Sequence, residues 1–564
     1  MMMNEKQILA SLIFEHIHSP ELSEEYLYKI IEIPKNPTLG DLAFPCFTLA
    51  KTFKKAPHEI AQNLGEKLKH PIIERVDVVG PYINFHLNRS IIGKEIVCKI
   101  LEEKDNYGSQ SFGNDKTIVV DFSSPNIAKP FSMGHLRSTV IGNALANIAN
   151  KCGFQTVRIN HLGDWGTQFG KLITAYKLWG NEEKVKENPI SELFILYKKF
   201  HEEAEKNPSL EEEGRKAFKR LEDGNDEELK LWEWFKNVSL LEFKNIYELL
   251  GISFDFYTGE AFYNDKMERV IELLKEKHLL EHSEGADVVP LTEFDLPPCL
   301  IRKSDGASLY ATRDLAAAIY RHETYHFTKA LYVVGHEQSI HFQQVFNVLK
   351  KLGFQWAEGM THVPFGLYLQ NGKKMSTRKG RVVLLEEVLN EVIKLALQNI
   401  QEKNPTLPNK EEVAKQIGVG AIIFHDLKNH RMNNIEFSLE EMLTFEGETG
   451  PYIQYTYARA CSLLRKGKYD SPSYKSLTDH DSWELIKQLK YFPSKIGEAF
   501  HGNDPSIIAK YIVDVAQAFN KYYGKVRILE SNEELESRLA LVQSVTIVLK
   551  EGLRLLGIQA PDQM

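Results

Sequence analysis

Residues 117–153 read TIVVDFSSPNIAKPFSMGHLRSTVIGNALANIANKCG, and this stretch decides the fold. It opens with a short apolar run, TIVVDF, of the kind that forms a buried strand in a parallel sheet. After a polar loop, apolar residues recur at every fourth position, as on one face of a helix: Leu136, Val140, Ala144 and Ile148. Gly153 is placed to end this helix, and QTVRIN is predicted to be the next strand. The stretch therefore predicts a βαβ unit.

A second βαβ unit is predicted from KALYVVG, SIHFQQVFNVLKKLG and THVPFGLYL, which are expected to be a strand, a helix and a strand. We expect an α/β fold with a doubly wound, parallel-sheet (Rossmann-like) domain at residues 116–385. A charged, helical insertion at about 178–247 separates its halves. The turn-rich residues 1–115 predict a small α+β domain, with helical apolar spacing at 50–68 and strands around 76–87 that break at Gly80-Pro81. Helical periodicity dominates residues 386–564, which predict an all-helical domain in which 441–466 is largely helical.

Composition excludes several protein classes. The chain of 564 residues is 43% apolar and 26% charged, as is usual for globular proteins. It contains no apolar run long enough for a membrane span and no signal-peptide core at its start, so a cytoplasmic protein is expected. Its five cysteines form no C-x-x-C pair, which argues against a zinc knuckle and a disulfide framework. The net charge of −8 gives no support by itself for nucleic-acid binding.

The loop before the predicted helix has the features of a phosphate site. Gly134 would let a ligand approach the backbone closely, and the free N–H groups at a helix start favour an anion. His135 could donate to a phosphate oxygen from the first turn. The alternative is a plain strand-to-helix turn with a histidine facing solvent. The sequence is neither G-x-G-x-x-G nor a Walker loop.

A second cationic loop, GKKMSTRKGR, spans residues 372–381 and follows a predicted strand. It places five basic residues in the nine positions from 373 to 381, with no acidic residue. Such a loop suits closure over a triphosphate, where its charges would stabilise departing pyrophosphate. The alternative is an ordinary solvated surface.

Together the two loops resemble the paired motifs of class I aminoacyl-tRNA synthetases. SMGH, at 132–135, stands where that family has "HIGH", and KMSTR, at 374–378, where it has "KMSKS". Further blocks narrow the resemblance to arginyl-tRNA synthetases: TLGDLAFP (38–45), VDFSSPNIAKPFSMGHLRST (120–139), NHLGDWGTQFG (160–170), KSDGASLYATRDLAAA (303–318) and GETGPYIQYTYAR (447–459). The resemblance covers nearly the whole chain. It implies a ligase that activates L-arginine with ATP and transfers it to tRNA(Arg).

The resemblance also implies roles for individual residues. The α-amino and carboxylate end of arginine is expected at Asn126, with Ser124 beside it, and at Gln338. The guanidinium is expected at Tyr310 and Asp314, with Glu260 as a second carboxylate. A planar guanidinium suits carboxylates, which can grip it with two hydrogen bonds. Apart from the resemblance, Asp314 could simply cap a helix.

ATP is expected to contact Ser132, Gly134, His135, Lys374 and Met375. His135 would lie within reach of both substrates, and His135 and Lys374 would act in catalysis. Two positions depart from the family pattern. Ser132 replaces the usual histidine and cannot become cationic, and Thr377 replaces the later lysine. We expect Lys129 to substitute for that lysine, with Arg378 and Lys379 as alternatives.

The resemblance assigns the N-terminal domain to the tRNA elbow and the C-terminal domain to the anticodon. It implies Mg²⁺ with the ATP substrate but no metal ion held by the protein, and we expect a monomer. The family is also one whose members need bound tRNA to activate their amino acid. Two other readings remain open. One is a synthetase for another amino acid or a small-molecule adenylating ligase, and the other is a tRNA-binding paralogue without catalysis.

Overall fold

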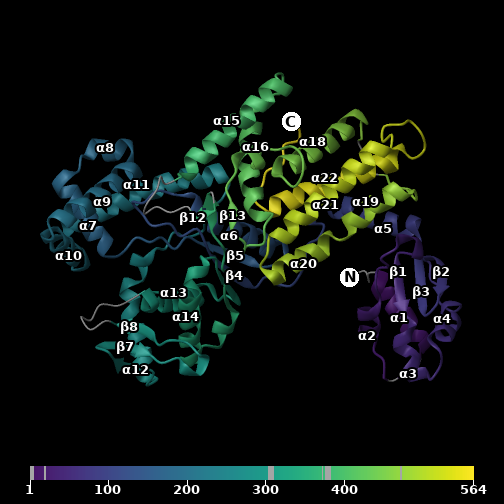
Figure 1. Ribbon diagram of the computed structural model, residues 1–564, viewed down its shortest axis with the longest axis horizontal. Coiled ribbons are helices and arrows are strands. Elements are labelled where there is room, and N and C mark those ends of the chain that lie inside the picture. The colour runs from purple at the N-terminus through teal and green to yellow at the C-terminus, as the bar shows by residue number, and fades with distance from the viewer. Residues whose placement is uncertain are drawn as a thin grey trace. The chain divides into compact units, whose positions relative to one another are not determined.

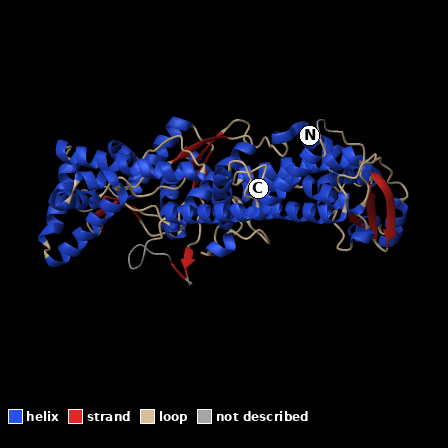
Figure 2. Cartoon of the chain, turned by 90° about the horizontal axis from the view of Figure 1, so that it is seen from above, coloured by secondary structure: helices blue, strands red, loops and turns tan. Residues whose placement is uncertain are grey.

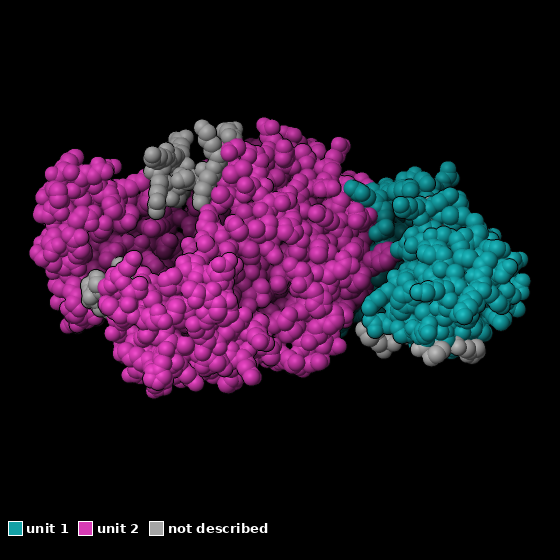
Figure 3. Space-filling model, turned by 60° about the horizontal axis from the view of Figure 1, so that its bottom comes forward, with its two compact units in different colours: residues 1–107, 462–490, 517–547 teal, residues 108–461, 491–516, 548–564 magenta. Residues whose placement is uncertain are grey.

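The computed structural model describes residues 5–17, 19, 21–302, 310–370, 372–374, 383–469 and 473–564, with the backbone alone for Pro37, Lys373 and Lys374. Helices make up most of the chain (Figure 2). Two compact units divide it (Figure 3): unit 1 is Met1–Tyr107, Ser462–Lys490 and Gln517–Ile547, and unit 2 is Gly108–Cys461, Tyr491–Ala516 and Val548–Met564. Within the described ranges, no helix has both the length and the apolar character that crossing a membrane requires.

Unit 2 is built on a four-stranded parallel sheet with the strand order β10-β9-β4-β5. Two of these strands, β4 and β5, are labelled beside α6 in Figure 1. Its strands are β4 (Thr117–Asp121), β5 (Gln155–Ile159), β9 (Lys329–Tyr332) and β10 (Met360–His362). The predicted first βαβ unit is confirmed, because β4 and β5 pair in parallel on either side of α6 (Met133–Lys151). The chain order reverses between β4 and β9. The loops that follow these two strands therefore border the crevice where open α/β sheets bind ligands.

Helix α6 packs on the sheet through the face that the sequence predicts. Its four periodic apolar residues are all buried: Leu136, Val140, Ala144 and Ile148. Burying an aliphatic side chain of this kind contributes about 1.5–3 kcal/mol. Gly142 permits the closest approach, because a Cβ there would lie 2.3 Å from the Phe122 side chain. The packing fixes the start of α6, and with it the predicted phosphate loop.

The second half of the sheet is β9, α14 (Ser339–Lys351) and β10, with the 3-10 helix η6 (His336–Gln338) after β9. The prediction that residues 361–369 form one strand is wrong. They divide between β10 and β11 (Tyr368–Gln370), which belongs to a separate sheet of order β12-β11-β13. Pro364 lies between the two strands, and proline has no N–H for a sheet ladder. The other strands of that sheet are β12 (Lys373–Lys374) and β13 (Ile435–Glu436).

The charged stretch between the two halves is helical. It contains α7 (Thr167–Trp179), α8 (Glu182–Glu187), α9 (Pro189–Lys206), α10 (Ser209–Glu222) and α11 (Asp226–Leu250). A short 3-10 helix, η4 (Glu260–Lys266), leads into α12 (Met267–Glu276), and α13 (Tyr310–Tyr325) precedes β9. Between α12 and α13 lies an antiparallel sheet of β6 (Glu281–Ser283), β7 (Ala286–Val289) and β8 (Cys299–Arg302).

Unit 1 contains an antiparallel sheet of order β1-β3-β2, made of β1 (Leu42–Pro45), β2 (Ile73–Val79) and β3 (Tyr82–Leu87). The predicted break at Gly80-Pro81 is confirmed as the turn between β2 and β3. The same unit contains the helices α1 (Glu5–Ile17), α2 (Glu24–Ile30) and α5 (Arg89–Glu103). The helical run expected at 50–68 is instead two helices, α3 (Ala50–Phe53) and α4 (Pro57–Gly65). The chain turns between them at Lys54, whose φ is 51°.

The C-terminal third is helical, as predicted. Its helices are α15 (Leu385–Lys403), α16 (Lys410–Leu427), α17 (Leu439–Met442), α18 (Gly450–Lys466), α19 (His480–Lys490), α20 (Phe492–Gly502), α21 (Ser506–Lys525) and α22 (Leu535–Leu555). The stretch from 441 to 466 was expected to be largely helical, and a non-helical segment separates α17 from α18 within it. The end of α22 packs on α6 in unit 2, where Glu551 and Lys151 form a buried ion pair of 2.9 Å.

Candidate active site

The loop between β4 and α6 has an unusual backbone. Three residues other than glycine have positive φ: Ser123 (73°), Ser124 (49°) and Ala128 (58°). Such conformations cost about 1–3 kcal/mol each and persist only where their surroundings enforce them. The Ser123 N–H donates to Ser138 Oγ of α6 (2.8 Å), and the Ala128 N–H donates to Ser239 Oγ of α11 (3.0 Å). These buried hydrogen bonds hold the loop in one shape.

Asn126 lies in this loop beside Gly163. The Ile127 N–H donates to the Gly163 carbonyl (3.2 Å), and the Gly163 N–H donates to the Pro125 carbonyl (3.1 Å). A Cβ at position 163 would lie 2.0 Å from Asn126 Oδ1, so glycine is required for this arrangement. Gly163 belongs to the block NHLGDWG, but only the fold reveals that it gives Asn126 its place.

The other two residues predicted for the α-amino and carboxylate end follow β4 and β9. Ser124 Oγ donates to Asp121 Oδ1, at the end of β4, over 3.0 Å. Gln338 is exposed at the end of η6 and precedes α14. The carboxyl ends of β4 and β9 lie side by side, since Asp121 pairs with Tyr332. Asn126, Ser124 and Gln338 therefore come from the two loops that border the same crevice.

Ser132 and His135 form a capping box at the start of α6. The Ser132 N–H donates to His135 Nδ1 over 3.1 Å, and Ser132 Oγ lies 3.2 Å from the same nitrogen. Because a backbone N–H only donates, Nδ1 accepts and the ring proton sits on Nε2. Ser132, in place of the usual histidine, thus begins the helix and orients His135.

The imidazole of His135 is neutral at physiological pH. Burial, together with the charge of Lys129, lowers the pKa of His135 to about 4. Its Nε2–H can therefore donate to an anion without the ring being cationic. Gly134, the preceding residue, is exposed and leaves the first turn of α6 open to a ligand. Both features suit the predicted phosphate site.

Lys129 lies between this site and the helical insertion. Its Nζ is 3.5 Å from Gln168 Oε1 and 5.7 Å from the centre of the Tyr197 ring. Its charge reaches His135, since it lowers the pKa of that ring. Lys129 is thus part of the surroundings of the predicted ATP residues.

The cationic loop is anchored at both ends. On one side β12 pairs antiparallel with β11, with Leu369 opposite Lys374. On the other side the Met133 N–H donates to the Val383 carbonyl (3.3 Å), and the Leu385 N–H donates to the Phe131 carbonyl (3.0 Å). The second anchor joins the segment just after this loop to the start of SMGH. Outside the described residues lie the side chain of Lys374 and the whole of Met375, Thr377, Arg378 and Lys379.

Glu260 begins η4 and is held by the NHLGDWG block. Its N–H donates to the Leu162 carbonyl (2.9 Å), and the next N–H, of Ala261, donates to Asp164 Oδ1 (2.8 Å). Asp164 is fully buried and pairs with Lys236 of α11 over 2.7 Å. Burial and the charges of Asp314 and Asp164, opposed by Arg313, raise the pKa of Glu260 to about 7.

Tyr310 and Asp314 are the first and fifth residues of α13, so they share one face of the helix. Asp314 lies inside the helix, and the alternative that it serves as an N-cap is wrong. Burial and the charge of Glu260 raise the pKa of Tyr310, and Asp314 in turn raises that of Glu260. The three residues predicted to bind the guanidinium therefore lie close enough to shift one another's ionisation.

A buried ion pair underlies this group. Arg321 Nη1 lies 2.7 Å from Asp121 Oδ2, and both side chains are almost wholly buried. Arg321 Nη2 is also 3.3 Å from His161 Nδ1. Arg321, on α13, thus links the end of β4 to His161, which lies in the loop that follows β5. Nothing in the sequence pattern singled out Arg321 or His161, because their pairing depends on contacts between distant segments.

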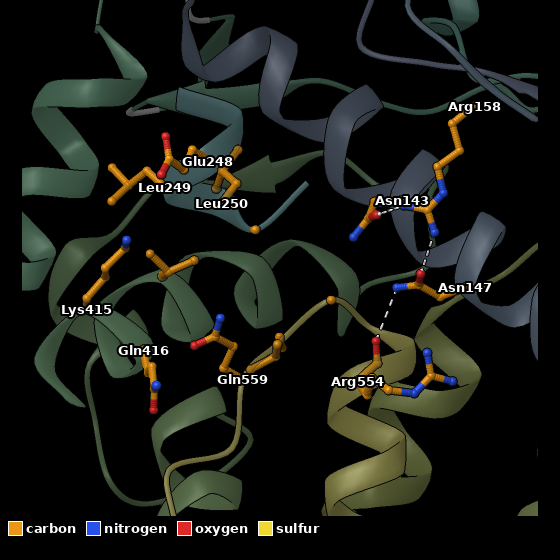
Figure 4. A pocket seen from close by; sticks show the side chains of 14 residues that line it. Asn143, Asn147, Arg158, Glu248, Leu249, Leu250, Lys415, Gln416, Arg554 and Gln559 are labelled. Atoms are coloured by element: carbon orange, nitrogen blue, oxygen red, sulfur yellow. Dashed lines mark hydrogen bonds between the residues drawn. The ribbon is translucent and has the colours of Figure 1, made fainter. Parts of the chain in front are cut away.

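A cavity of about 270 Å³ lies elsewhere in unit 2 (Figure 4). The C-terminal half of α6 lines it with Asn143 and Asn147, whose side-chain carbonyls accept from Arg158 over 2.8 and 2.7 Å. Glu248, Lys415 and Arg554 lie around the same space (Figure 4). None of the described residues predicted to bind arginine or ATP lines this cavity, so the candidate active site is a different place.

Comparisons with known families match most of the chain. Residues 96–439 match "tRNA synthetases class I (R), catalytic domain", and residues 453–564 match the "DALR anticodon binding domain". Residues 6–87 match the "Arginyl tRNA synthetase N terminal domain".

Curated relatives and solved structures agree with these matches. The chain is 62% identical to Arginine--tRNA ligase 2 of Bacillus anthracis over 97% of this chain and 98% of that protein. It is 61% identical to Arginine--tRNA ligase of Exiguobacterium sibiricum over the full length of both. The structure of Thermus thermophilus arginyl-tRNA synthetase is similar over 100% of both chains, with a TM-score of 0.81 and 26% identity. Arginyl-tRNA synthetase from Plasmodium falciparum gives the same TM-score and identity over 99% of both chains.

Proposed function

The chain belongs to the class I arginyl-tRNA synthetases, and from that premise we propose which of its residues carry out the reaction. It activates L-arginine with ATP and transfers the arginyl group to tRNA(Arg) for protein synthesis. In the first step an α-carboxylate oxygen of arginine attacks the α-phosphorus of ATP, and pyrophosphate leaves. In the second step a hydroxyl of the terminal tRNA ribose attacks the arginyl carbonyl, and AMP leaves.

Asp314, Glu260 and Tyr310 bind the guanidinium in this proposal. The observation that carries it is that the charge of Asp314 raises the pKa of Glu260, because two half-buried carboxylates near enough to interact favour a cation that both can reach. Asp314 is ionised there. Although burial opposes ionisation, the hydrogen bond from His341 and the nearby positive groups lower the pKa of Asp314 below its usual value. Asn126, Ser124 and Gln338 bind the α-amino and carboxylate end.

Ser132, Gly134, His135, Lys374 and Met375 contact ATP. The exposed first turn of α6 supports this assignment for Gly134 and His135, because its free N–H groups and the His135 Nε2–H can all donate to phosphate oxygens. His135 and Lys374 act on the reacting phosphates. Lys129 supplies the positive charge that the family pattern has where this chain has Thr377, and its influence on His135 supports that role.

Magnesium accompanies ATP in this proposal. Among the residues that the structure describes, no three His, Cys, Asp or Glu side chains come together to hold a metal ion. Asp121, at the start of the ATP loop, is already paired with Arg321. These residues fit an ion that is held mainly by the triphosphate and water, as Mg²⁺ commonly is. The ion would supply charge neutralisation on the phosphates.

Residues 386–564 read the anticodon and residues 1–115 bind the tRNA elbow. The family matches of these regions support the assignment. On α18, Tyr455 is 42% exposed and lies 4.8 Å from the Arg459 guanidinium, a pairing suited to an unpaired base. We also propose that the protein is cytoplasmic and works as a monomer. Sedimentation with and without tRNA would test the oligomeric state.

ATP–pyrophosphate exchange tests the reaction and the substrate. Exchange should require arginine and should be far faster when tRNA(Arg) is present. Exchange with lysine in place of arginine would contradict the guanidinium site. Absence of exchange under every condition would favour a tRNA-binding paralogue without catalysis.

A further inference from the structure

Among the residues that the structure describes, one donates a hydrogen bond to the carboxylate of Asp314, and a second lies near it without bonding. His341 Nε2 donates to Asp314 Oδ2 over 2.6 Å. His161 Nε2 lies 4.0 Å from the other oxygen, Oδ1, which is beyond hydrogen-bond distance. The Asp314 side chain is 27% exposed, whereas that of His161 is 16% exposed. The carboxylate is therefore held from one side and has free acceptor positions on the other.

The proton positions on His161 follow from its partner. Arg321 Nη2 approaches His161 Nδ1 to 3.3 Å, and a guanidinium can only donate. Nδ1 accordingly accepts, and the proton of the neutral ring sits on Nε2, facing Asp314. Burial lowers the pKa of His161, which keeps the ring neutral. Arg321 is itself fixed by Asp121, so His161 cannot follow Asp314 if that carboxylate turns.

Asp314 thus stands between two imidazole N–H donors. His341 comes from α14 and His161 from the loop after β5, so the two donors belong to opposite halves of the sheet. Rotation of Asp314 toward His161 would satisfy that donor but would use the oxygen that the guanidinium needs. The short bond to His341 prevents this rotation.

We propose that His341 is a positioning residue for arginine specificity: it holds Asp314 in the orientation that leaves the other acceptor positions of the carboxylate to the substrate guanidinium. The inference rests on the proposed role of Asp314. His341 does not touch the substrate, and it acts through the carboxylate. A misplacement of about 1 Å at a binding group can cost up to about 100-fold in rate. The loss should fall on arginine binding and not on ATP.

Two substitutions separate the donor from the bulk of the ring. His341→Leu removes the donor, and His341→Gln keeps an N–H that can reach Asp314. The matched control is His322→Gln on α13, whose ring stacks on Trp356 at 4.6 Å instead. KM and kcat for arginine, and KM for ATP, are measured by pyrophosphate exchange with tRNA present, and melting temperatures are recorded for each variant.

His341→Leu should raise the KM for arginine by about 10- to 100-fold and leave the KM for ATP unchanged. His341→Gln should restore most of the loss, and His322→Gln should resemble the parent protein. An unchanged arginine KM in His341→Leu would overturn the proposal. Equal losses in the Leu and Gln variants would overturn the donor role.

Asp314→Asn distinguishes the proposed role of His341 from the proposed role of Asp314 in binding the guanidinium. If Asp314→Asn leaves the KM for arginine unchanged, the guanidinium site itself is wrong. If Asp314→Asn raises that KM but His341→Leu does not, only the role of His341 is wrong. The double variant should bind arginine no worse than Asp314→Asn alone, because His341 acts only through this carboxylate.

Discussion

The backbone N–H of Met133 donates to the carbonyl of Val383 over 3.3 Å, and this contact joins SMGH to the far end of the cationic loop. The Leu385 N–H completes the junction by donating to the Phe131 carbonyl. The residues that these bonds join are about 250 positions apart in sequence. The start of α6 and the segment that follows the cationic loop are therefore fixed to each other through the main chain.

Leu385→Pro should remove the Leu385–Phe131 hydrogen bond of this junction while leaving α15 folded. Leu385 is the first residue of α15, and Leu384 before it is extended (φ −72°, ψ 132°), so proline fits there. Proline removes only the N–H that bonds to Phe131, apart from the buried leucine side chain. We expect adenylation to slow about tenfold relative to Leu385→Ala, because one hydrogen bond contributes about 1–1.5 kcal/mol. Equal adenylation rates in the two variants, measured in single turnovers, would show that the junction does not matter.

Lys129→Ala should slow adenylation much more than it weakens arginine binding. Loss of a group aimed at transition-state charge typically costs about 3–4 kcal/mol, or 100- to 1,000-fold in kcat. Lys129→Arg keeps the charge and should retain most of the rate. Single-turnover formation of arginyl-adenylate measures the step. A small effect, or one on arginine KM alone, would move the role to Arg378 or Lys379.

The KM for arginine should fall as pH rises toward about 7 and change little above it. Because the pKa of Glu260 is raised to about 7, this carboxyl is protonated below that pH and meets the guanidinium without charge.

A raised carboxyl pKa also means that the folded, unliganded protein binds the proton of Glu260 more tightly than the unfolded chain does. Its contribution to stability therefore decreases as pH rises from about 4.5 to 7.

Glu260→Gln supplies the control for this pH dependence. It should raise the KM for arginine above pH 7 and flatten the profile below it. Steady-state exchange between pH 5.5 and 8.5 measures both, and an unaltered profile in the variant would assign the titration to another group.

Gly134→Ala should raise the KM for ATP without destabilising the protein. Of the atoms that the structure describes, a Cβ at this position would meet only Ser132 Oγ, at an ordinary contact distance of 3.5 Å, and alanine favours helix. The new methyl group would instead obstruct a phosphate at the exposed first turn. We expect a rise of about tenfold, equivalent to one lost hydrogen bond. Gly524→Ala, in open space near the end of α21, is the matched control for ATP binding. A normal KM for ATP in Gly134→Ala would remove the phosphate from this turn.

The sequence predicts the parts of this protein that depend on local pattern. The apolar period of α6, the run of β4 and the turn at Gly80-Pro81 all appear where their residues predict them. The prediction failed at 361–369, where an apolar run resembled one strand although Pro364 divides it between two sheets. The stretch 441–466 is largely helical, as its pattern predicts, but the segment with Gly447, whose φ is 77°, separates α17 from α18 within it.

Prediction of the site residues from the sequence has the same limit, because it depends on local pattern. The resemblance led to Asn126, Glu260 and Asp314, and the fold brings the two carboxylates together. It could not lead to His341 or Arg321, because their importance lies in which distant residues they meet. A histidine on α14 has no distinctive spacing in the sequence. Only the 2.6 Å contact with Asp314 distinguishes it from the chain's other histidines.

The packing of α22 on α6 has a consequence for synthesis on the ribosome. Residues 548–564 belong to the same compact unit as α6, and Glu551 is the buried partner of Lys151. N-terminal parts of a chain emerge first and begin folding while translation continues. The helix that presents His135 must wait for these residues, hundreds of codons later, before its far end is paired. An interrupted nascent chain would therefore carry both signature motifs and still lack the completed unit that uses them.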